Sequence, residues 1–286
     1  ASTVINTNSP RMLDIPMAQG IMDFARAGQL SIITPFCLAG AMAPITVEGA
    51  LVLQHAEALA GITLAQLSKT GAPVAYGGFG SNVDMKSGAP AFGTPEQVKM
   101  TMGTGQLARL IGLPWRTAGG AASNVADMQA GLENNMAMWA TVMAGATVVK
   151  HAAGWQEGGL TFGYEKFIND VEALQTFAEL CQAPETGENA LAWSAIAEVE
   201  PGGHFFDTGQ TMRRYKDAFY DPLVADLSNY GAWSEAGGNT STERAFAVWQ
   251  NALSSYQALE NVGEIAERLK PYIDAQTDAG GAPPVS

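Results

Sequence analysis

The feature that most constrains the fold of this chain is a regular alternation of two kinds of segment. Short apolar runs rich in β-branched residues are each followed by a longer segment with helical spacing. This pattern predicts strands at residues 3–7, 30–36, 72–79, 113–118 and 146–151. The helices predicted after them cover residues 16–27, 46–67, 94–110, 124–144 and 160–181. Repeated βα units of this kind form a parallel sheet with helices packed on it.

The loops of this pattern differ in length at the two ends of the strands. Long glycine-rich loops follow strands at residues 35–44, 77–93 and 117–123, whereas the connections from helix to strand are short. In a (β/α) barrel the functional loops gather at the carboxyl ends of the strands, and a closed barrel has eight βα units. We therefore predict an α/β fold, a TIM-type (β/α) barrel of which this chain supplies five of the eight βα units.

Past residue 183 the pattern changes. Residues 189–199 and 241–255 have helical spacing and are joined by a stretch rich in glycine, aspartate and aromatic residues. We expect residues 1–183 to form part of a (β/α)8 barrel and residues 184–273 to form a helical extension packed on it. Residues 274–286 are predicted to be a disordered tail, because they contain two prolines and few apolar anchors.

Composition and charge exclude several classes of protein. Of the 286 residues, 47% are hydrophobic and 15% are charged, which is too apolar for a disordered chain. The net charge of −13 argues against partners that are nucleic acids or anionic membranes. The uncharged run between Arg26 and Glu48 is long enough to cross a bilayer. However, Pro35 and Pro44 would break such a helix, so we predict a buried strand and loop there.

Cysteine and histidine are scarce in the chain. Cys37 and Cys181 lie far apart, and neither belongs to a CxxC pair. With only three histidines as well, no structural metal site is expected. The lack of a disulfide framework suits a reducing compartment, so we predict a cytoplasmic location. No signal peptide is expected, because the first residues lack a charged segment followed by an apolar one.

Residues able to carry chemistry stand at the end of the fifth predicted strand. Lys150 and His151 close this strand and lead into Trp155 and Glu157. Because neighbouring strand residues point to opposite faces, Lys150 and His151 cannot both face the mouth of a barrel. We expect His151 to be the functional residue of the two. The alternative is that one side chain reaches solvent and the other caps a loop.

Aromatic residues form a second group near the strand ends. Tyr76 and Phe79 lie beside glycines that allow a backbone to approach a ligand closely, and Trp115 and Arg116 close the next strand. Together with Trp155, these rings would suit a quaternary ammonium group, because aromatic faces attract cations that offer no hydrogen-bond donor. Ordinary core filling is the competing interpretation of the same residues.

Several longer motifs resemble those of the trimethylamine methyltransferase superfamily, and the resemblance runs from about residue 4 to about residue 257. The motifs are Thr34-Pro35-Phe36, Gly40-Ala41-Met42-Ala43-Pro44, residues 81–95, His151-Ala152-Ala153-Gly154-Trp155 and Pro201-Gly202-Gly203-His204. The resemblance implies a (β/α)8 barrel that moves a methyl group from a methylated amine to the cobalt of a separate corrinoid protein. Family members normally carry a substantial further segment first, so residues 1–183 resemble the C-terminal part of that barrel.

The trimethylamine enzymes of this superfamily carry pyrrolysine, which the resemblance places in the loop at residues 119–123. Here the loop consists of Gly119-Gly120-Ala121-Ala122-Ser123, which are all ordinary residues. The resemblance therefore points to the branch that lacks pyrrolysine, some members of which demethylate glycine betaine or related quaternary amines.

The leading hypothesis is a methyltransferase that moves a methyl group from a quaternary or methylated amine, such as glycine betaine, to Co(I) of a corrinoid protein. The candidate substrate-binding residues are Tyr76, Phe79, Trp115, Arg116 and Trp155. The candidate catalytic residues are His151 and Glu157. The rings would surround the ammonium group, Arg116 or His151 would hold a substrate carboxylate, and Glu157 would balance the cation. The corrinoid would be carried by the partner protein and not bound directly by this chain.

Two other hypotheses remain open at this stage. The first is a Schiff-base aldolase on a similar barrel, which needs Lys150 to be buried, inward-facing and lowered in pKa. The second is a non-catalytic partner of full-length relatives. Because an incomplete sheet exposes the edges of its outer strands, we also expect association with another copy or with a completing chain.

Overall fold

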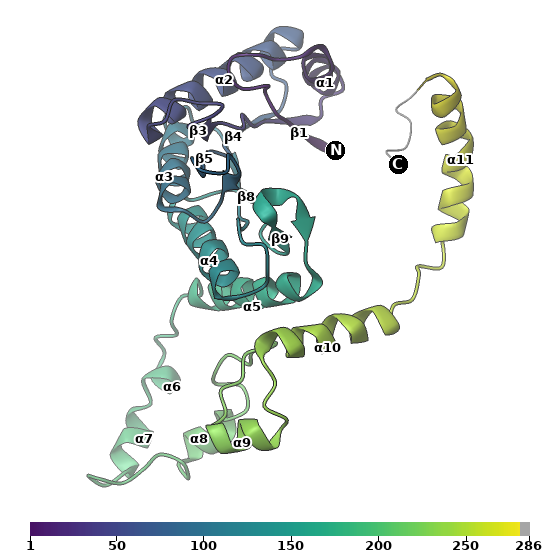
Figure 1. Cartoon of the computed structure of the whole chain (residues 1–286). Coiled ribbons are helices and arrows are strands. Elements are labelled where there is room, and N and C mark those ends of the chain that lie inside the picture. The colour runs from purple at the N-terminus through teal and green to yellow at the C-terminus, as the bar shows by residue number, and fades with distance from the viewer. Residues whose placement is uncertain (281–286) are drawn as a thin grey trace. The chain divides into compact units, whose positions relative to one another are not determined.

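The computed structural model describes residues 1–280, and all five predicted strands form one parallel sheet in it (Figure 1). The strand order in this sheet is β1-β2-β4-β7-β8, with every pairing parallel. Its strands are β1 (Ser2–Ile5), β2 (Leu30–Ile33), β4 (Val74–Gly77), β7 (Trp115–Ala118) and β8 (Val148–Lys150). The predicted parallel βα organisation is therefore confirmed.

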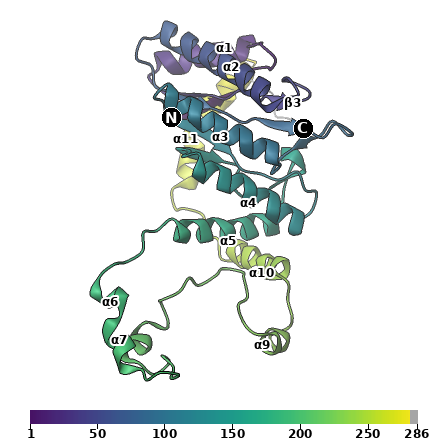
Figure 2. The same cartoon turned by 90° about the vertical axis from the view of Figure 1, so that its left-hand side faces the viewer.

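A helix follows each of these strands and covers the same face of the sheet, as Figure 2 shows for the layer formed by α1 to α5. These helices are α1 (Ile15–Arg26), α2 (Val47–Ser68), α3 (Pro95–Leu110), α4 (Met128–Met143) and α5 (Tyr164–Leu180). Polar side chains begin four of them by accepting a backbone N–H of the first turn. These capping residues are Asp14, Thr46, Thr94 and Asp127.

The register of the sheet separates two kinds of side chain. Ile5, Ile33, Tyr76 and Trp115 pair in one continuous row across four strands. Because paired residues of parallel strands share a face, this row packs together against the helices, and all four side chains are buried. Arg116 follows Trp115 directly and therefore belongs to the opposite face.

The sheet curls with its helices on one side, which is the arrangement of half a barrel (Figure 1). β1 and β8 are its edge strands. The predicted α/β class is therefore confirmed. Within residues 1–280 the five parallel strands form part of a barrel, and the sheet does not close on itself. The edge strands carry backbone groups that further strands can pair with.

Two small sheets follow the main strands where loops were predicted, except that the strand at Thr161–Phe162 occupies the first residues of the helix predicted at 160–181. One contains β3 (Leu38–Ala39), β5 (Ser81–Val83) and β6 (Pro90–Ala91), with β5 in the middle. The other is a hairpin of β9 (Trp155–Gln156) and β10 (Thr161–Phe162) around a short 3₁₀ turn at Glu157–Gly159. Strands of two or three residues are too short to show a period in sequence, which is why the sequence analysis missed them.

Helix α2 is long and apolar enough to cross a membrane by length and composition, alone among the helices of residues 1–280. It packs against β2, β4, α1 and α3 as one of the helices covering the sheet. The uncharged run before it forms β2, β3 and their loops, as predicted. Both cysteines are free: Cys37 is buried and Cys181 is exposed.

The chain divides into two compact units, Ala1–Phe246 and Ala247–Ser286. The helices beyond α5 are α6 (Glu188–Leu191), α7 (Trp193–Glu198), α8 (Gly209–Arg214), α9 (Tyr230–Glu235), α10 (Ser241–Ser254) and α11 (Val262–Asp278). The predicted helix at residues 189–199 is interrupted at Ala192, which has a left-handed backbone. The predicted barrel boundary at residue 183 stays a prediction. Helix α11 continues to Asp278, so residues 274–278 of the segment predicted as a disordered tail are helical. Residues 281–286 lie outside the described part.

Candidate functional site

Five rings from the loops after the main strands form a continuous aromatic cluster, consisting of Phe36, Phe79, Phe92, His151 and Trp155. The ring centroids of Phe79 and Phe92 are 5.0 Å apart with an interplanar angle of 14°. Trp155 stacks on both, at 5.7 Å from Phe79 and 5.8 Å from Phe92. His151 lies almost flat on Trp155, with 3.9 Å between centroids and 17° between planes. These distances are within the range of favourable aromatic pairs or shorter.

The backbone between His151 and Trp155 makes an unusual turn that places the two rings together. His151 has a φ of 55° and Gly154 a φ of 83°, so both lie in the left-handed region. At Gly154 a side chain would also collide with Phe162, because a Cβ there would lie 2.3 Å from its ring. Glycine is therefore required at this point of the loop.

Arg116 extends from β7 to the aromatic cluster and has no counter-charge among residues 1–280. Its side chain is buried, and its guanidinium carbon lies 5.6 Å from the centroid of the Phe79 ring. Within residues 1–280, no carboxylate forms an ion pair with it, and its Nε has no hydrogen-bond partner. Burial lowers the pKa of Arg116 to about 10, so the group remains positively charged at neutral pH. A buried cation of this kind is costly until an anion reaches it.

His151 forms the exposed end of the aromatic cluster and is uncharged at neutral pH. Partial burial of its ring lowers the pKa of His151 to about 4, and the positive charges of Arg116 and Lys150 lower it further. The imidazole is therefore an uncharged aromatic face next to Trp155. Such a face does not repel a positively charged ligand.

Tyr76 and Trp115 are not part of this cluster, which corrects the prediction that they line one cleft with His151 and Trp155. Both side chains pack between the sheet and its helices, in a core that includes Ala108. The Tyr76 hydroxyl lies 3.1 Å from Nδ1 of His55, and Trp115 Nε1 donates to the carbonyl of Gly145 at 2.9 Å. The reason is the alternation of side chains along β4 and β7, since only Arg116 of this group faces away from the helices.

Lys150 and Glu157 border the cluster in different ways. Lys150 ends β8, an edge strand of the sheet, and is exposed, so residues 1–280 do not provide the burial that the Schiff-base alternative requires. Glu157 is half-buried in the turn of the β9–β10 hairpin, and its backbone N–H donates to the Ser123 carbonyl at 3.0 Å. This bond ties the hairpin to the loop at residues 119–123. A catalytic role for Glu157 stays a prediction.

Three polar side chains that the sequence analysis did not single out support the site from α4 and α5. Glu133 accepts the backbone N–H groups of Ala122 and Ser123, each at 2.9 Å. Asn134 and Asp170 are buried and bond to the loops after β7 and β8. In sequence these residues look like ordinary polar positions of amphipathic helices. Only in the folded chain do they reach the loops after β7 and β8 and form hydrogen bonds with the backbone there.

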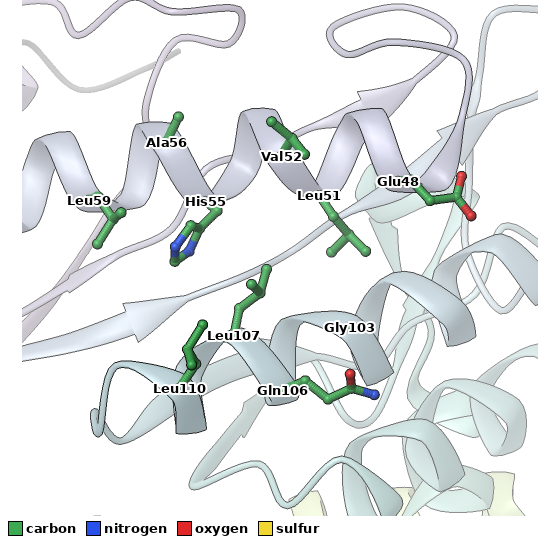
Figure 3. Close-up of a pocket in the computed structure, with 10 residues that line it drawn as sticks. All are labelled: Glu48, Leu51, Val52, His55, Ala56, Leu59, Gly103, Gln106, Leu107 and Leu110. Carbon is green, nitrogen blue, oxygen red and sulfur yellow. The ribbon is translucent and has the colours of Figure 1, made fainter.

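A separate apolar groove of about 730 Å³ lies between α2 and α3 (Figure 3). Leu51, Val52, Leu59, Leu107 and Leu110 line it together with His55. It contains none of the predicted site residues. No group of three His, Cys, Asp or Glu residues suited to a metal ion occurs within residues 1–280.

The fold and the site define a half-barrel α/β protein with an aromatic cluster and a buried arginine at the carboxyl ends of its strands. The family model of the trimethylamine methyltransferases (MTTB) matches residues 1–281, and the chain belongs to this family. The resemblance inferred from the sequence motifs is thereby confirmed.

Among relatives, the chain is similar to the glycine betaine methyltransferase of Desulfitobacterium hafniense (strain Y51). The two are 36% identical over 278 residues, which cover 97% of this chain and 56% of the relative. This chain is also 30% identical to the trimethylamine methyltransferase MttB1 of Methanosarcina mazei over 274 residues, which cover 96% of this chain and 55% of that protein. The chain therefore spans about half the length of the curated relatives it matches.

Proposed function

We propose that the chain is part of a corrinoid-dependent methyltransferase whose substrate is a betaine-type compound, with both a quaternary ammonium group and a carboxylate. The observation that carries the proposal is Arg116, which is buried beside the aromatic cluster and has no ion-pair partner within residues 1–280. Trimethylamine has no anionic group that could pair with a buried guanidinium, whereas a betaine offers its carboxylate. Membership of the family and similarity to a glycine betaine methyltransferase support the same substrate class.

In this proposal the two ends of the substrate contact different parts of the site. The carboxylate pairs with Arg116, in a charge-assisted contact that can be bidentate. The ammonium group lies against the His151 and Trp155 rings, which attract it through their faces. Because the pKa of His151 is lowered to about 4, its ring adds no positive charge next to the substrate at neutral pH. Glu157 is proposed to balance the ammonium charge from the hairpin turn.

The proposed reaction makes modest demands on this chain. The C–N bond of one methyl group breaks, its electron pair stays on nitrogen, and the methyl group passes to the cobalt of a corrinoid carried by a separate protein. The amine leaves in neutral form, so no proton has to be supplied. The task of the site is to orient the methyl group and exclude water. The catalytic assignments of His151 and Glu157 are proposals in this sense.

We further propose that β1 and β8 pair with additional βα units, so that a complete (β/α)8 barrel surrounds the site. These units would come from a completing segment or chain, or from association with a second copy. The length of the relatives and the two unpaired edges of the sheet support this. A cytoplasmic location, with two free cysteines, is proposed as well.

The test supplies this chain with the part of the D. hafniense glycine betaine methyltransferase that the match leaves out, together with its corrinoid protein. Visible spectroscopy of the corrinoid then follows methylation by glycine betaine, other betaines, trimethylamine and tetramethylammonium. We expect methylation by a carboxylate-bearing quaternary amine and little from tetramethylammonium. Equal rates with both kinds of substrate would contradict the role of Arg116. No methylation across the panel would favour a non-catalytic role for the chain.

A further inference from the structure

We propose that Asp170, assisted by Asn134, is a positioning residue that holds the His151 and Trp155 rings in their stacked arrangement. The value of this arrangement for substrate rests on the proposed function, because the two rings are the proposed contacts of the ammonium group. The geometry itself does not depend on that function. Asp170 and Asn134 both bond to the backbone of the loop after β8, and they act on the rings through it.

Asp170 reaches this loop from helix α5. Its Oδ2 accepts the backbone N–H of Gly154 at 2.8 Å, and the carboxylate forms an ion pair with Lys166 on the preceding turn. Both side chains are almost completely buried, at 2% exposure for Lys166 and 4% for Asp170. Gly154 lies between His151 and Trp155, so the bond fixes the point around which the two rings are arranged.

Asn134 holds the same loop from helix α4. Its side-chain amide donates to the carbonyl of Ala152 at 3.0 Å, and its Oδ1 accepts the backbone N–H of Gly120 at 3.1 Å. One buried side chain therefore connects the loop after β8 to the loop after β7. The backbone is thus anchored at residues 152 and 154, on either side of Ala153, by side chains of helices α4 and α5.

The backbone of this loop explains why such anchors are needed. The left-handed conformation of His151 is uncommon for a residue that carries a side chain, and it persists only with support from the surroundings. Gly154 cannot carry a side chain that would hold it, because Phe162 occupies that space. The loop can therefore be held at Gly154 through its backbone N–H, which donates a hydrogen bond to Asp170.

The buried ion pair also points to a role beyond stability. Burying two charges costs free energy that their attraction often fails to recover, and apolar replacements of similar size are commonly neutral or stabilising. Lys166 compensates the charge of Asp170, and Asp170 is the member of the pair that contacts the site loop. We infer that the acceptor oxygen of Asp170 is the functional element and that Lys166 makes its burial tolerable.

Two double variants separate these roles in the full chain. Asp170→Asn with Lys166→Met removes both charges but keeps an oxygen that can accept from Gly154. Asp170→Leu with Lys166→Met also removes both charges but leaves no acceptor. The two variants match in net charge and in the number and branching of side-chain heavy atoms, so a difference between them reports the polar amide, whose oxygen is the acceptor. Circular dichroism and urea unfolding establish that each variant is folded.

The readout is proton NMR of the His151 ring, assigned by its loss in a His151→Gln variant. Stacking on Trp155 should displace the ring protons of His151 upfield from those of the exposed His204. We expect the Asn/Met variant to keep this displacement and the low pKa of His151. We expect the Leu/Met variant to lose the displacement, with the pKa of His151 returning toward its ordinary value. If the two variants behave alike, the proposal is overturned.

A second measurement covers the case in which the Leu/Met variant does not fold. Hydrogen exchange of the Gly154 amide in the unaltered chain should be slow, and exchange at the rate of an unprotected amide would overturn the proposal. In an assembled, active enzyme, loss of the acceptor should weaken betaine binding about 2- to 30-fold, which corresponds to losing one cation–π contact. The NMR readout needs no substrate or corrinoid, so failure of methyl transfer would leave the positioning role standing.

Discussion

Replacing Arg116 with methionine is expected to stabilise the folded chain while abolishing its preference for carboxylate ligands. Arg116 is 3% exposed and has no anionic partner in residues 1–280. Methionine is unbranched and flexible, occupies a similar volume, carries no charge and packs well against aromatic rings such as Phe79. The substitution therefore removes an uncompensated buried charge without leaving a large cavity.

The magnitude follows from the pKa of Arg116, which burial lowers from the ordinary value of an arginine to about 10. Since one pKa unit corresponds to about 1.4 kcal/mol, this lowering amounts to a penalty of about 3 kcal/mol on the charged form in the folded state. The pKa is lower in the folded than in the unfolded chain, so the full penalty applies below about pH 10 and disappears as the pH rises toward the ordinary pKa of an arginine. The cation–π contact with Phe79 offsets about 0.5–2 kcal/mol of it. A net gain of about 1–2.5 kcal/mol is expected for Arg116→Met.

Urea unfolding at pH 7 measures this gain, with Arg26→Met as the matched control. Arg26 is on the surface of α1, where its side chain is 60% exposed and pairs weakly with Asp23, so its replacement should change stability by less than about 0.5 kcal/mol. The same samples, heated with glycine betaine or tetramethylammonium, report ligand binding as a rise in melting temperature. Only the betaine effect should disappear in Arg116→Met. If Arg116→Met destabilises the chain by more than 1 kcal/mol, Arg116 has an anionic partner and the reasoning fails.

Three further predictions concern the rings and a buried carboxylate. Trp155→Leu should weaken binding of quaternary ammonium ligands by about 0.5–2 kcal/mol in calorimetry, and unchanged affinity would argue against a ring contact. Because the pKa of His151 is lowered from 6.5 to about 4 on folding, stability should fall as the pH drops through this range, and His151→Gln should lack this component. Identical pH profiles for the two chains would refute it. Glu57 is buried and accepts the hydroxyls of Thr7 and Ser9 at 2.5 and 2.6 Å. Glu57→Ala should therefore lower the free energy of unfolding by about 2–4 kcal/mol, and a loss below 1 kcal/mol would contradict this account.

The main sheet and its helices were predictable because their signals are local. Each apolar β-branched run stands next to a helical period, and caps such as Thr46 and Thr94 mark where two of the helices begin. The strand order then follows from the short connections between each helix and the next strand, because consecutive βα units lie side by side in a parallel sheet. The small sheets were not predictable, because a two-residue strand such as β3 depends on a partner far along the chain.

The site was predictable in its position but not in its membership. The sequence placed chemistry-bearing residues at the carboxyl ends of strands, and Phe79, Arg116, His151 and Trp155 do come together there. Which face of the sheet a residue occupies depends on a shift of one position along the strand. Trp115 was therefore assigned to the site although it packs against the helices.

Tyr76 and Phe79 illustrate the same limit at the end of β4. The predicted strand extended to residue 79, but the observed strand ends at Gly77. Tyr76 is therefore fixed by the pleat of the sheet, whereas Phe79 lies in the following loop and its ring joins the aromatic cluster. The supporting residues Asn134 and Asp170 were beyond sequence reasoning, because their partners are backbone atoms of distant loops.

The most direct test of the central claim follows the methyl group itself. The chain is first completed with the part of a relative that it does not match, and a reduced corrinoid protein is added. The mixture is then incubated with glycine betaine labelled with ¹³C in its methyl groups. Mass spectrometry should then find dimethylglycine and labelled, methylated corrinoid in equal amounts, and Arg116→Met should reduce both together. If neither product forms while the intact relative produces both under the same conditions, the proposed methyl transfer is wrong for this chain.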